Sequence, residues 1–145
     1  MEVKIVNKST NESPKYSREG DAGMDLRANI EGNVTFTQID SFGWAVVPTG
    51  IYVDIPKGYY GQIASRSGLA FKEKIEAFNG VIDSNYRGEL KVLLKNLSPI
   101  RKTIEHGQRI AQLLIKPIAT AETVEVESLE ESNRGEQGFG SSGKH

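Results

Sequence analysis

Apolar and polar residues alternate in short stretches along most of this chain, and β-branched residues are frequent within those stretches. Alternation with a period of two residues is the pattern of a half-buried β-strand. It predicts strands at Glu2–Val6, Val34–Ile39, Trp44–Val47, Ile51–Ile55, Tyr59–Ala64, Glu89–Leu94, Arg109–Ile115 and Thr123–Glu127. A helical pattern is confined to Leu69–Ala77 and is short. Many short strands at close spacing are typical of an all-β sandwich or barrel.

Turn signals separate the expected strands and agree with this interpretation. They include Glu31-Gly32-Asn33, Pro48-Thr49-Gly50, Pro56-Lys57-Gly58, Asn79-Gly80, Arg87-Gly88 and His106-Gly107. The 145 residues suffice for one ordinary domain, and neither an internal repeat nor a linker divides them. We expect a β domain over residues 1–133, followed by a glycine-rich arm over residues 134–145.

The arm differs in composition from the rest of the chain. Residues 134–143 contain four glycines together with Arg134, Phe139, Ser141 and Ser142. A segment so rich in glycine cannot build a core, and a frayed terminus is the simpler interpretation. An aromatic side chain among glycines, hydroxyls and an arginine indicates instead a mobile lid that closes on an anionic ligand, because backbone N–H groups and guanidinium groups bind phosphate.

Composition narrows the chemistry that the chain can perform. There is no cysteine, and one of the two histidines, His145, is the last residue. These counts exclude thiol chemistry, cysteine-bound zinc and a two-histidine metal motif, so we expect a hard cation bound by oxygen and proton transfer by Asp or Glu. The net charge of −1 and the lack of a long apolar run favour neither nucleic acid nor a membrane as a partner, and we expect a cytoplasmic protein.

Two motifs place polar residues at the ends of apolar stretches in the first half of the chain. In Ala22–Ala28, alternation puts Asp25 on the opposite face from its apolar neighbours, where a salt-bridged strand residue is the simpler interpretation. Arg66, Ser67 and Gly68 follow the strand Tyr59–Ala64 and open the helical segment. Guanidinium, hydroxyl and free backbone N–H groups at a helix start favour a phosphate site, although a serine N-cap accounts equally well for this motif.

Two further motifs lie in the second half of the chain. In Asn79–Leu90 we expect a β-hairpin with Asp83 directly after an apolar pair and Tyr86 close by. A partly desolvated Asp there can act as a general base on water, and the tyrosine ring can pack on a sugar or base, although a turn Asp and a core Tyr are the simpler interpretation. In Gly107–Ile115, Gln108 could donate to a phosphate, whereas we expect Gln112 to bond backbone inside the sheet. His106 is interpreted as a surface turn residue.

The order of the motifs is more specific than any one of them. The segments AGMDLRA, SRSGLA, GVIDSNYRGE, GQRIAQLLI and RGEQGFGSSG follow one another over residues 22–143. In content and order they resemble the motifs of the trimeric dUTPase (deoxyuridine 5′-triphosphate nucleotidohydrolase) family. The resemblance implies an all-β jelly-roll or β-barrel-like sandwich that forms a homotrimer with shared active sites and a flexible C-terminal arm. It also implies Mg²⁺-dependent hydrolysis of dUTP to dUMP and pyrophosphate, which keeps uracil out of DNA and supplies dUMP for thymidylate synthesis.

The resemblance also implies roles for residues at matching motif positions. Asp83 would be the base that activates the attacking water. The substrate-binding residues would be Arg66, Ser67, Gly68, Gly80, Val81, Ile82, Tyr86, Gln108, Arg134, Phe139, Gly140, Ser141 and Ser142. Within this set, the Gly80–Tyr86 segment would recognise uracil largely through its backbone, Tyr86 would lie under the deoxyribose and exclude UTP, and Phe139 would stack on uracil. Mg²⁺ would be held through the triphosphate, and Asp25 would support the site or the waters of this metal.

The sequence departs from the family pattern at one position, and two other function classes are alternatives to dUTP hydrolysis. Asn85 stands where many family members carry a second acid, which would remove a negative charge near Asp83 if that acid is close enough to couple. A dCTP deaminase has the same fold and would release ammonia from dCTP. A nucleotide-binding or protein-interaction role without turnover is the other alternative, although such a binder would have no need of Asp83.

Overall fold

The computed structural model of the chain describes residues 1–133 and 135. Its elements, in chain order, are β1 (Lys4–Asn7), β2 (Met24–Arg27), β3 (Phe36–Ile39), β4 (Trp44–Pro48), β5 (Ile51–Asp54), β6 (Tyr59–Ala64), α1 (Ser67–Glu73), β7 (Ile75–Ala77), β8 (Val81–Ile82), β9 (Lys91–Asn96), β10 (Lys102–Glu105) and β11 (Arg109–Pro117). The predicted arm, residues 134–145, lies outside the described residues except for Gly135.

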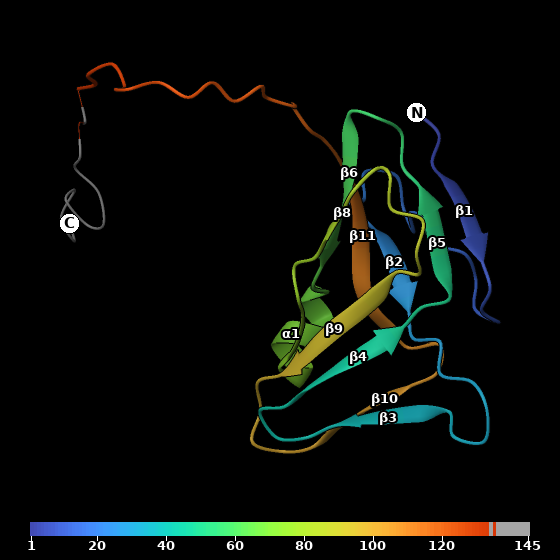
Figure 1. The fold of residues 1–145 in the computed structure, drawn as a ribbon. Coiled ribbons are helices and arrows are strands. Elements are labelled where there is room, and N and C mark those ends of the chain that lie inside the picture. The colour runs from blue at the N-terminus through green and yellow to red at the C-terminus, as the bar shows by residue number, and fades with distance from the viewer. Residues whose placement is uncertain (134, 136–145) are drawn as a thin grey trace.

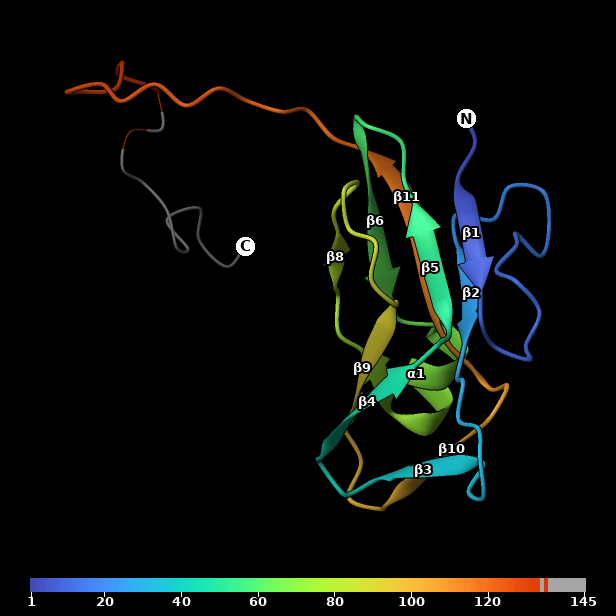
Figure 2. The ribbon, with the colours of Figure 1, turned by 45° about the vertical axis from the view of Figure 1, so that its right-hand side comes forward.

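The strands form four antiparallel sheets that together enclose one core. A four-stranded sheet has the order β2-β11-β6-β8, and a three-stranded sheet has the order β4-β9-β7. Two pairs, β1-β5 and β10-β3, complete the body. Figure 1 and Figure 2 show the β3–β10 pair at one end of this body and the N-terminus at the other. The predicted all-β sandwich fold is confirmed.

Alternation along the strands produces the core. In β2, Met24 and Leu26 are buried and Asp25 lies between them on the other face. In β9, Val92 and Leu94 are completely buried and alternate with more exposed residues. Burial of apolar side chains is the main stabilising contribution to such a fold. The alternation that favoured strands in the sequence therefore also identifies which face of each strand carries polar chemistry.

Most of the predicted strands are confirmed, with shifts of a few residues at their ends. The strand Tyr59–Ala64 has the predicted bounds. No strand bounds were predicted for β2, β7, β8 and β10, which have between two and four residues. The alternation noted in Ala22–Ala28 covers β2, and the hairpin expected in Asn79–Leu90 covers β8, whereas β7 and β10 were missed. Segments this short hold too few alternating positions for a period of two to stand out.

The predicted strand Thr123–Glu127 is wrong for the single chain. No strand or helix occurs at residues 118–133, and this segment runs away from the β body (Figure 1). Its apolar residues still alternate with polar ones in the sequence, but Val124 and Val126 are 76% and 57% exposed. A strand needs a neighbour for its backbone hydrogen bonds, and the described part of the chain provides none here.

The predicted helix Leu69–Ala77 is correct only in part. The helix begins earlier, at Ser67, and ends at Glu73 because Lys74 adopts the left-handed conformation with φ 58°. The following residues form β7, which pairs with β9 and buries Ile75 and Ala77. Pairing with β9 and burial on the core face prevail there over the weak helical pattern. No helix among the described residues is long and apolar enough to cross a membrane.

Candidate functional site

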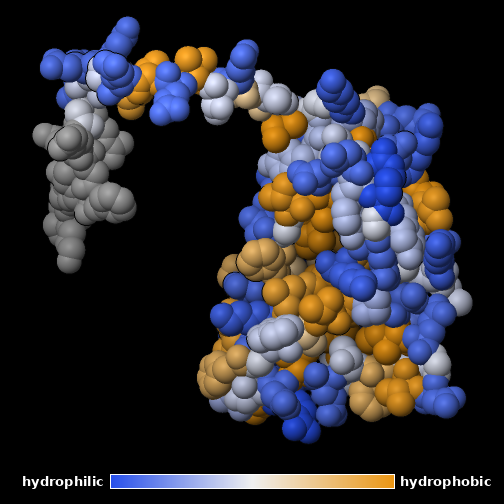
Figure 3. All heavy atoms as spheres, viewed as in Figure 1, coloured by the Kyte–Doolittle hydropathy of each residue, from blue (hydrophilic) through white to orange (hydrophobic). Residues whose placement is uncertain are grey.

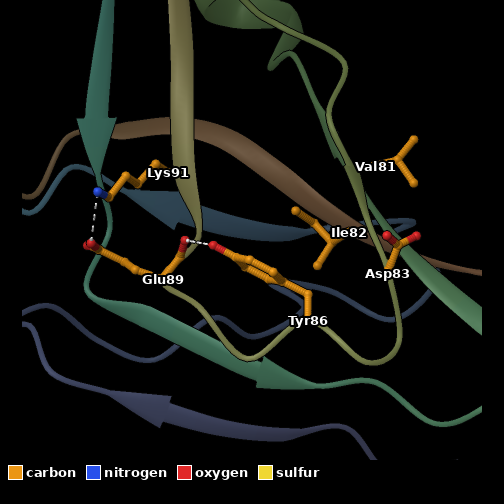
Figure 4. Close-up of a pocket in the computed structure, with 6 residues that line it drawn as sticks. All are labelled: Val81, Ile82, Asp83, Tyr86, Glu89 and Lys91. Atoms are coloured by element: carbon orange, nitrogen blue, oxygen red, sulfur yellow. Dashed lines mark hydrogen bonds and ion pairs between the residues drawn. The ribbon is translucent and has the colours of Figure 1, made fainter.

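A hollow of about 350 Å³ lies at the end of β8, where Asp83 was expected to act. It is lined by Val81, Ile82, Asp83, Tyr86, Glu89 and Lys91. Figure 4 shows the Tyr86 ring extending across this hollow, with Asp83 on one side and Glu89 on the other. The structure therefore brings together the carboxylate and the aromatic ring that the sequence placed in one motif.

The strand β8 lies at an edge of the four-stranded sheet and carries Asp83 at its end. It pairs with β6 in the register Gly61 to Ile82 and Gln62 to Val81. The predicted β-hairpin is wrong, because β9 pairs with β4 and β7 instead of with β8. The residues after Ile82 consequently form a loop, and Asp83 is exposed at its start.

The ring of Tyr86 is held by its own loop. The Tyr86 N–H donates to the carbonyl oxygen of Asp83 at 3.0 Å, and its hydroxyl donates to the carbonyl oxygen of Glu89 at 3.0 Å. The ring lies directly against Gly88, where a Cβ atom would overlap Oη and Cζ of Tyr86. Only glycine leaves room for this ring position. Tyr86 is 42% exposed in the single chain, so it is not the core tyrosine that the simpler interpretation proposed.

The second motif forms a cluster of opposite charges on the four-stranded sheet. Arg66 occupies the N-cap position of α1 and its side chain forms no cap hydrogen bond. Its Nε donates instead to Oδ1 of Asp25 at 2.8 Å, and Nη1 of Arg109 donates to Oδ2 of Asp25 at 3.2 Å. Asp25 is thus the salt-bridged strand residue that its alternation indicated. It also holds the arginine that was expected to contact phosphate.

The start of α1 keeps backbone donors available. The serine N-cap interpretation is wrong, because Ser65 bonds the backbone of Ala77 through Oγ and Arg66 is the N-cap residue. Among the described residues, no hydrogen bond uses the N–H groups of Ser67 or Gly68. The first N–H groups of a helix have no partner within it. Two backbone donors therefore lie at the start of α1, directly after Arg66 in the chain.

The two glutamines of the fourth motif lie in different places. Oε1 of Gln108 accepts the Glu105 N–H at 3.0 Å and so closes the turn between β10 and β11. Gln112 lies in β11, opposite Asp25 on one side and Ala64 on the other. Directly opposed residues project to the same face of a sheet, so Gln112 shares the face of Asp25. The sequence indicated only a backbone-bonding role for Gln112, because the register that places it opposite Asp25 depends on contacts distant in sequence.

His106 is bonded through both ring nitrogens. Its Nδ1 accepts the Ile30 N–H at 3.1 Å, and its Nε2 lies 3.0 Å from Oγ1 of Thr10. An accepting Nδ1 places the ring hydrogen on Nε2, where it donates to Thr10. The residue lies in a turn as predicted, and its hydrogen bonds give it a structural role there.

The hollow and the charged cluster are separate within one chain. None of Arg66, Ser67, Gly68, Gln108 or Asp25 lines the hollow that contains Asp83. The predicted arm residues Arg134, Phe139, Gly140, Ser141 and Ser142 lie outside the described residues. The described chain thus carries a carboxylate with an aromatic ring in one place and anion-binding donors in another.

Comparisons with known proteins agree with the motifs and the fold. The family model described as dUTPase matches residues 9–143. A deoxyuridine 5'-triphosphate nucleotidohydrolase from Fusobacterium nucleatum subsp. nucleatum is 47% identical in an alignment 146 residues long that covers 99% of this chain and 98% of that protein. The protein of the same name from Finegoldia magna is 47% identical in an alignment 145 residues long that covers 99% of each chain.

Solved dUTPase structures have the same fold. The dUTPase of Staphylococcus bacteriophage 80alpha with dUPNHPP superposes with a TM-score of 0.88, at 32% identity over 98% of each chain. A mutant dUTPase from phage phi11 of S. aureus, whose structure describes coordination of a structural Mg(II) ion, superposes with a TM-score of 0.80. It is 26% identical and covers 90% of this chain and 100% of its own. On the family model, the near full-length relatives and the shared fold, this chain belongs to the dUTPase family.

Proposed function

We propose that this protein hydrolyses dUTP to dUMP and pyrophosphate, with Asp83 as the base that activates water. The observation that carries this proposal is the hollow in which Asp83 stands beside the fixed ring of Tyr86. Asp83 would take a proton from water while the water oxygen bonds the α-phosphorus. The bond from that phosphorus to the bridging oxygen would break and release pyrophosphate. Positioning and charge neutralisation provide most of the catalysis in such transfers.

The open edge of β8 supports recognition of uracil by the backbone. The Gly80 carbonyl accepts the Ile63 N–H at 2.9 Å, so Gly80 faces β6. Hydrogen-bonding directions alternate along an antiparallel pair, and Val81 therefore turns its N–H and C=O groups away from β6. One donor and one acceptor at this edge match O4 and N3–H of uracil. Cytosine would present N3 as an acceptor to the Val81 carbonyl, and unpaired buried groups reject a wrong partner strongly.

The sugar would lie on Tyr86. The ring is fixed by Gly88 and by the hydroxyl bond to the Glu89 carbonyl, so it cannot move aside easily. A 2′-hydroxyl group that met this ring would lose its hydration without gaining a partner. This arrangement would favour dUTP over UTP.

We propose that the phosphates are bound by a second copy of the chain. Arg66, the Ser67 and Gly68 N–H groups and Gln108 are donors suited to phosphate, and Gln112 shares the sheet face of Asp25, which holds Arg66. None of these residues lines the Asp83 hollow. A second, mainly apolar hollow of about 510 Å³ is lined in part by Trp44, Ala77, Phe78 and Leu93. Its lining includes the residues that directly precede Gly80 in the sequence. Figure 3 shows apolar residues gathered on this face of the body, over β4 and β9. This face supports packing of another copy next to the site.

The unpaired segment Thr123–Glu127 supports the same assembly, because its alternating valines would be buried by pairing with a neighbouring copy. We propose the homotrimer that the family resemblance implies, in which the arm residues Arg134 and Phe139 close on the bound nucleotide. Mixed trimers of Asp83→Asn and Arg66→Gln chains test this sharing. With equal amounts of the two chains and random assembly, a site is active when the chain that supplies Asp83 and the neighbouring chain that supplies Arg66 are both intact at these positions. Each condition is met about half of the time, so we expect activity in roughly a quarter of the sites. An inactive mixture would show that one chain supplies both residues.

Magnesium fits this site as a companion of the triphosphate. Among the described residues, no group of three His, Cys, Asp or Glu side chains could hold a metal ion. Both carboxylate oxygens of Asp25 already bond arginines, so this residue would meet the ion only through water. Mg²⁺ keeps several waters and prefers phosphate oxygens, and on the triphosphate it neutralises negative charge. The expected cytoplasmic location likewise stays a prediction.

A pyrophosphate-release assay across the nucleoside triphosphates, with and without Mg²⁺, tests the function. We expect Mg²⁺-dependent release from dUTP, with UTP, dTTP and dCTP nearly inert. Absence of dUTP turnover by the purified protein would contradict the proposal. Ammonia release from dCTP would identify a deaminase on the same fold instead.

A further inference from the structure

The loop that carries Asp83 and Tyr86 has no strand or helix of its own. It runs from the end of β8 to the start of β9 and turns at Ser84 and Asn85. Its last residue, Leu90, is buried and bonds Ile51 and Thr49. Before Leu90, the side chains of Glu89 and Arg87 also attach the loop to the body. Oε1 of Glu89 accepts the Gly50 N–H at 2.9 Å and ties the end of the loop to the turn between β4 and β5. The Arg87 side chain connects the middle of the loop to β5.

Arg87 bonds the loop and a strand at the same time. Its Nη1 donates to the carbonyl oxygens of Ser84 at 2.8 Å and Tyr86 at 2.9 Å. Its Nη2 forms an ion pair with Oδ1 of Asp54, at the end of β5. One guanidinium group therefore connects two loop carbonyls to a strand that pairs with β1. A planar fork with several donors can make these bonds together, whereas the ammonium group of lysine is a single point of charge.

These bonds act on the backbone next to the tyrosine ring. The Tyr86 carbonyl is bonded by Arg87, and its N–H is bonded by the Asp83 carbonyl. With both peptide groups of Tyr86 held, the direction of its Cα–Cβ bond is set, and Gly88 then receives the ring. The Arg87 and Asp54 side chains are 56% and 46% exposed, and exposed pairs contribute little to folding stability. Their main effect is therefore on the position of the loop.

We propose that Arg87, anchored by Asp54, is a positioning residue that orients the Tyr86 ring and thereby contributes to the discrimination between dUTP and UTP. The inference rests on the proposed function of this site. Neither Arg87 nor Asp54 lines the hollow that holds both Asp83 and Tyr86, although both line a second hollow that Asp83 also borders. The sugar specificity would thus depend on an ion pair that does not border the Tyr86 ring.

The test compares Arg87→Gln and Asp54→Asn with the wild-type protein by kcat/KM for dUTP and for UTP. Hydrogen exchange of peptides that cover residues 83–89 reports the loop independently of activity. We expect both variants to lower the dUTP-to-UTP ratio of kcat/KM by about tenfold, the scale of a small misplacement in a site. Hydrogen exchange in the loop should rise in both variants. Arg87→Lys should recover less than half of the decrease in the dUTP-to-UTP ratio, because the lysine ammonium lacks the several donors of the planar guanidinium group.

Arg101→Gln is the matched control. Arg101 pairs with Asp40 through Nε at 2.7 Å, and their side chains are 61% and 74% exposed, but neither residue belongs to the loop or its anchors. This variant should leave both the ratio and the exchange of the loop unchanged. A wild-type ratio in Arg87→Gln would overturn the proposal even if exchange rises, because the role of Arg87 would then be structural only. A wild-type protein without dUTP turnover would overturn the proposed function itself, and the inference with it.

Discussion

Asp25 and Arg66 are 41 residues apart in sequence, and the carboxylate of Asp25 accepts the Nε–H of Arg66 at 2.8 Å. The other oxygen of Asp25 accepts a bond from Arg109 at 3.2 Å. Two guanidinium groups thus share one carboxylate, which leaves one net positive charge in the cluster. The bond uses Nε, and no hydrogen bond among residues 1–133 and 135 uses the terminal NH₂ groups of Arg66, so within this part of the chain they are available to a ligand. The cluster orients an arginine while leaving its ability to bind phosphate intact.

Asp25→Asn should lower kcat/KM for dUTP by about 10-fold to 100-fold, because the loss of the charge releases the Arg66 fork from its orientation. Steady-state pyrophosphate release measures this effect. Asp21→Asn is the control, since Asp21 is an exposed residue that accepts a hydrogen bond from the Arg18 N–H within its own turn. Equal kinetics in Asp25→Asn and the wild-type protein would show that Arg66 needs no such partner.

Asp83→Asn should reduce kcat by about 10²-fold to 10⁴-fold, the usual contribution of a general base. Binding of a non-hydrolysable dUTP analogue should change little, because uracil and phosphates would be held by other groups. Calorimetric titration with the analogue separates the two effects. Turnover at the wild-type rate would remove Asp83 as the base.

Gly88→Ala should displace the Tyr86 ring, because a Cβ atom at this position would overlap Oη and Cζ of the tyrosine. We expect kcat/KM for dUTP to fall by about tenfold or more and the preference over UTP to weaken. Tyr86→Phe is the comparison, since it keeps the ring on Gly88 and loses only the hydroxyl bond to Glu89. If Gly88→Ala retained the preference for dUTP, the ring position would not determine sugar selection.

Asn96 should be important for stability. It is completely buried, its amide nitrogen donates to the carbonyls of Ile39, Asp40 and Ile100, and its oxygen accepts two bonds from Ser98. Asn96→Ala would remove all five bonds and leave the Ser98 N–H, which donates to the Asn96 oxygen, without this acceptor in the buried interior. We expect a loss of about 2–4 kcal/mol in the free energy of unfolding. Urea denaturation measures it. Asn33→Ala, at an exposed position, should cost less than about 0.5 kcal/mol.

The ion pair between the exposed Glu73 and the partly buried Lys102 predicts a pH effect. The hydrogen bond and the charge of Lys102 lower the pKa of Glu73 below its ordinary value of 4.5. A lowered pKa in the folded state means that the pair stabilises the fold above pH 4.5 and that this contribution is lost as the pH falls through the lowered pKa. In an NMR titration of the Glu73 carboxyl carbon, Lys102→Gln should move the midpoint upward. An unchanged midpoint would show that Lys102 does not act on Glu73.

The sequence predicted the fold class and most strands because alternation is a local property of each strand. It did not place the bounds of β8, since two residues show no period, and it extended the helix through Ile75 because apolar residues at that spacing suit either structure. Pairing of Ile75–Ala77 with β9 decided the outcome. The strand expected at Thr123–Glu127 was wrong because alternation does not reveal whether a partner strand is available within the chain.

The functional site was also predicted only in part, because the sequence does not reveal which distant residues come into contact. The motifs identified Asp83, Tyr86, Arg66 and Asp25, since their residue types and order are written in the chain. They did not reveal that Arg87 bonds Asp54, nor that Gln112 faces Asp25 while Gln108 closes a turn. The Arg87–Asp54 and Gln112–Asp25 relations join residues that are distant in sequence, whereas the turn bond of Gln108 depends on the local backbone geometry.

The sequence by itself determined the kinds of chemistry that this protein can perform and the family to which it belongs. The absence of cysteine and the single internal histidine restricted it to oxygen and guanidinium groups, and the ordered motifs named those groups. Only the tertiary structure decided which of them meet. Side-chain chemistry is a property of each residue, whereas the separation of the Asp83 hollow from the Arg66 cluster follows from strand pairing and packing between distant segments.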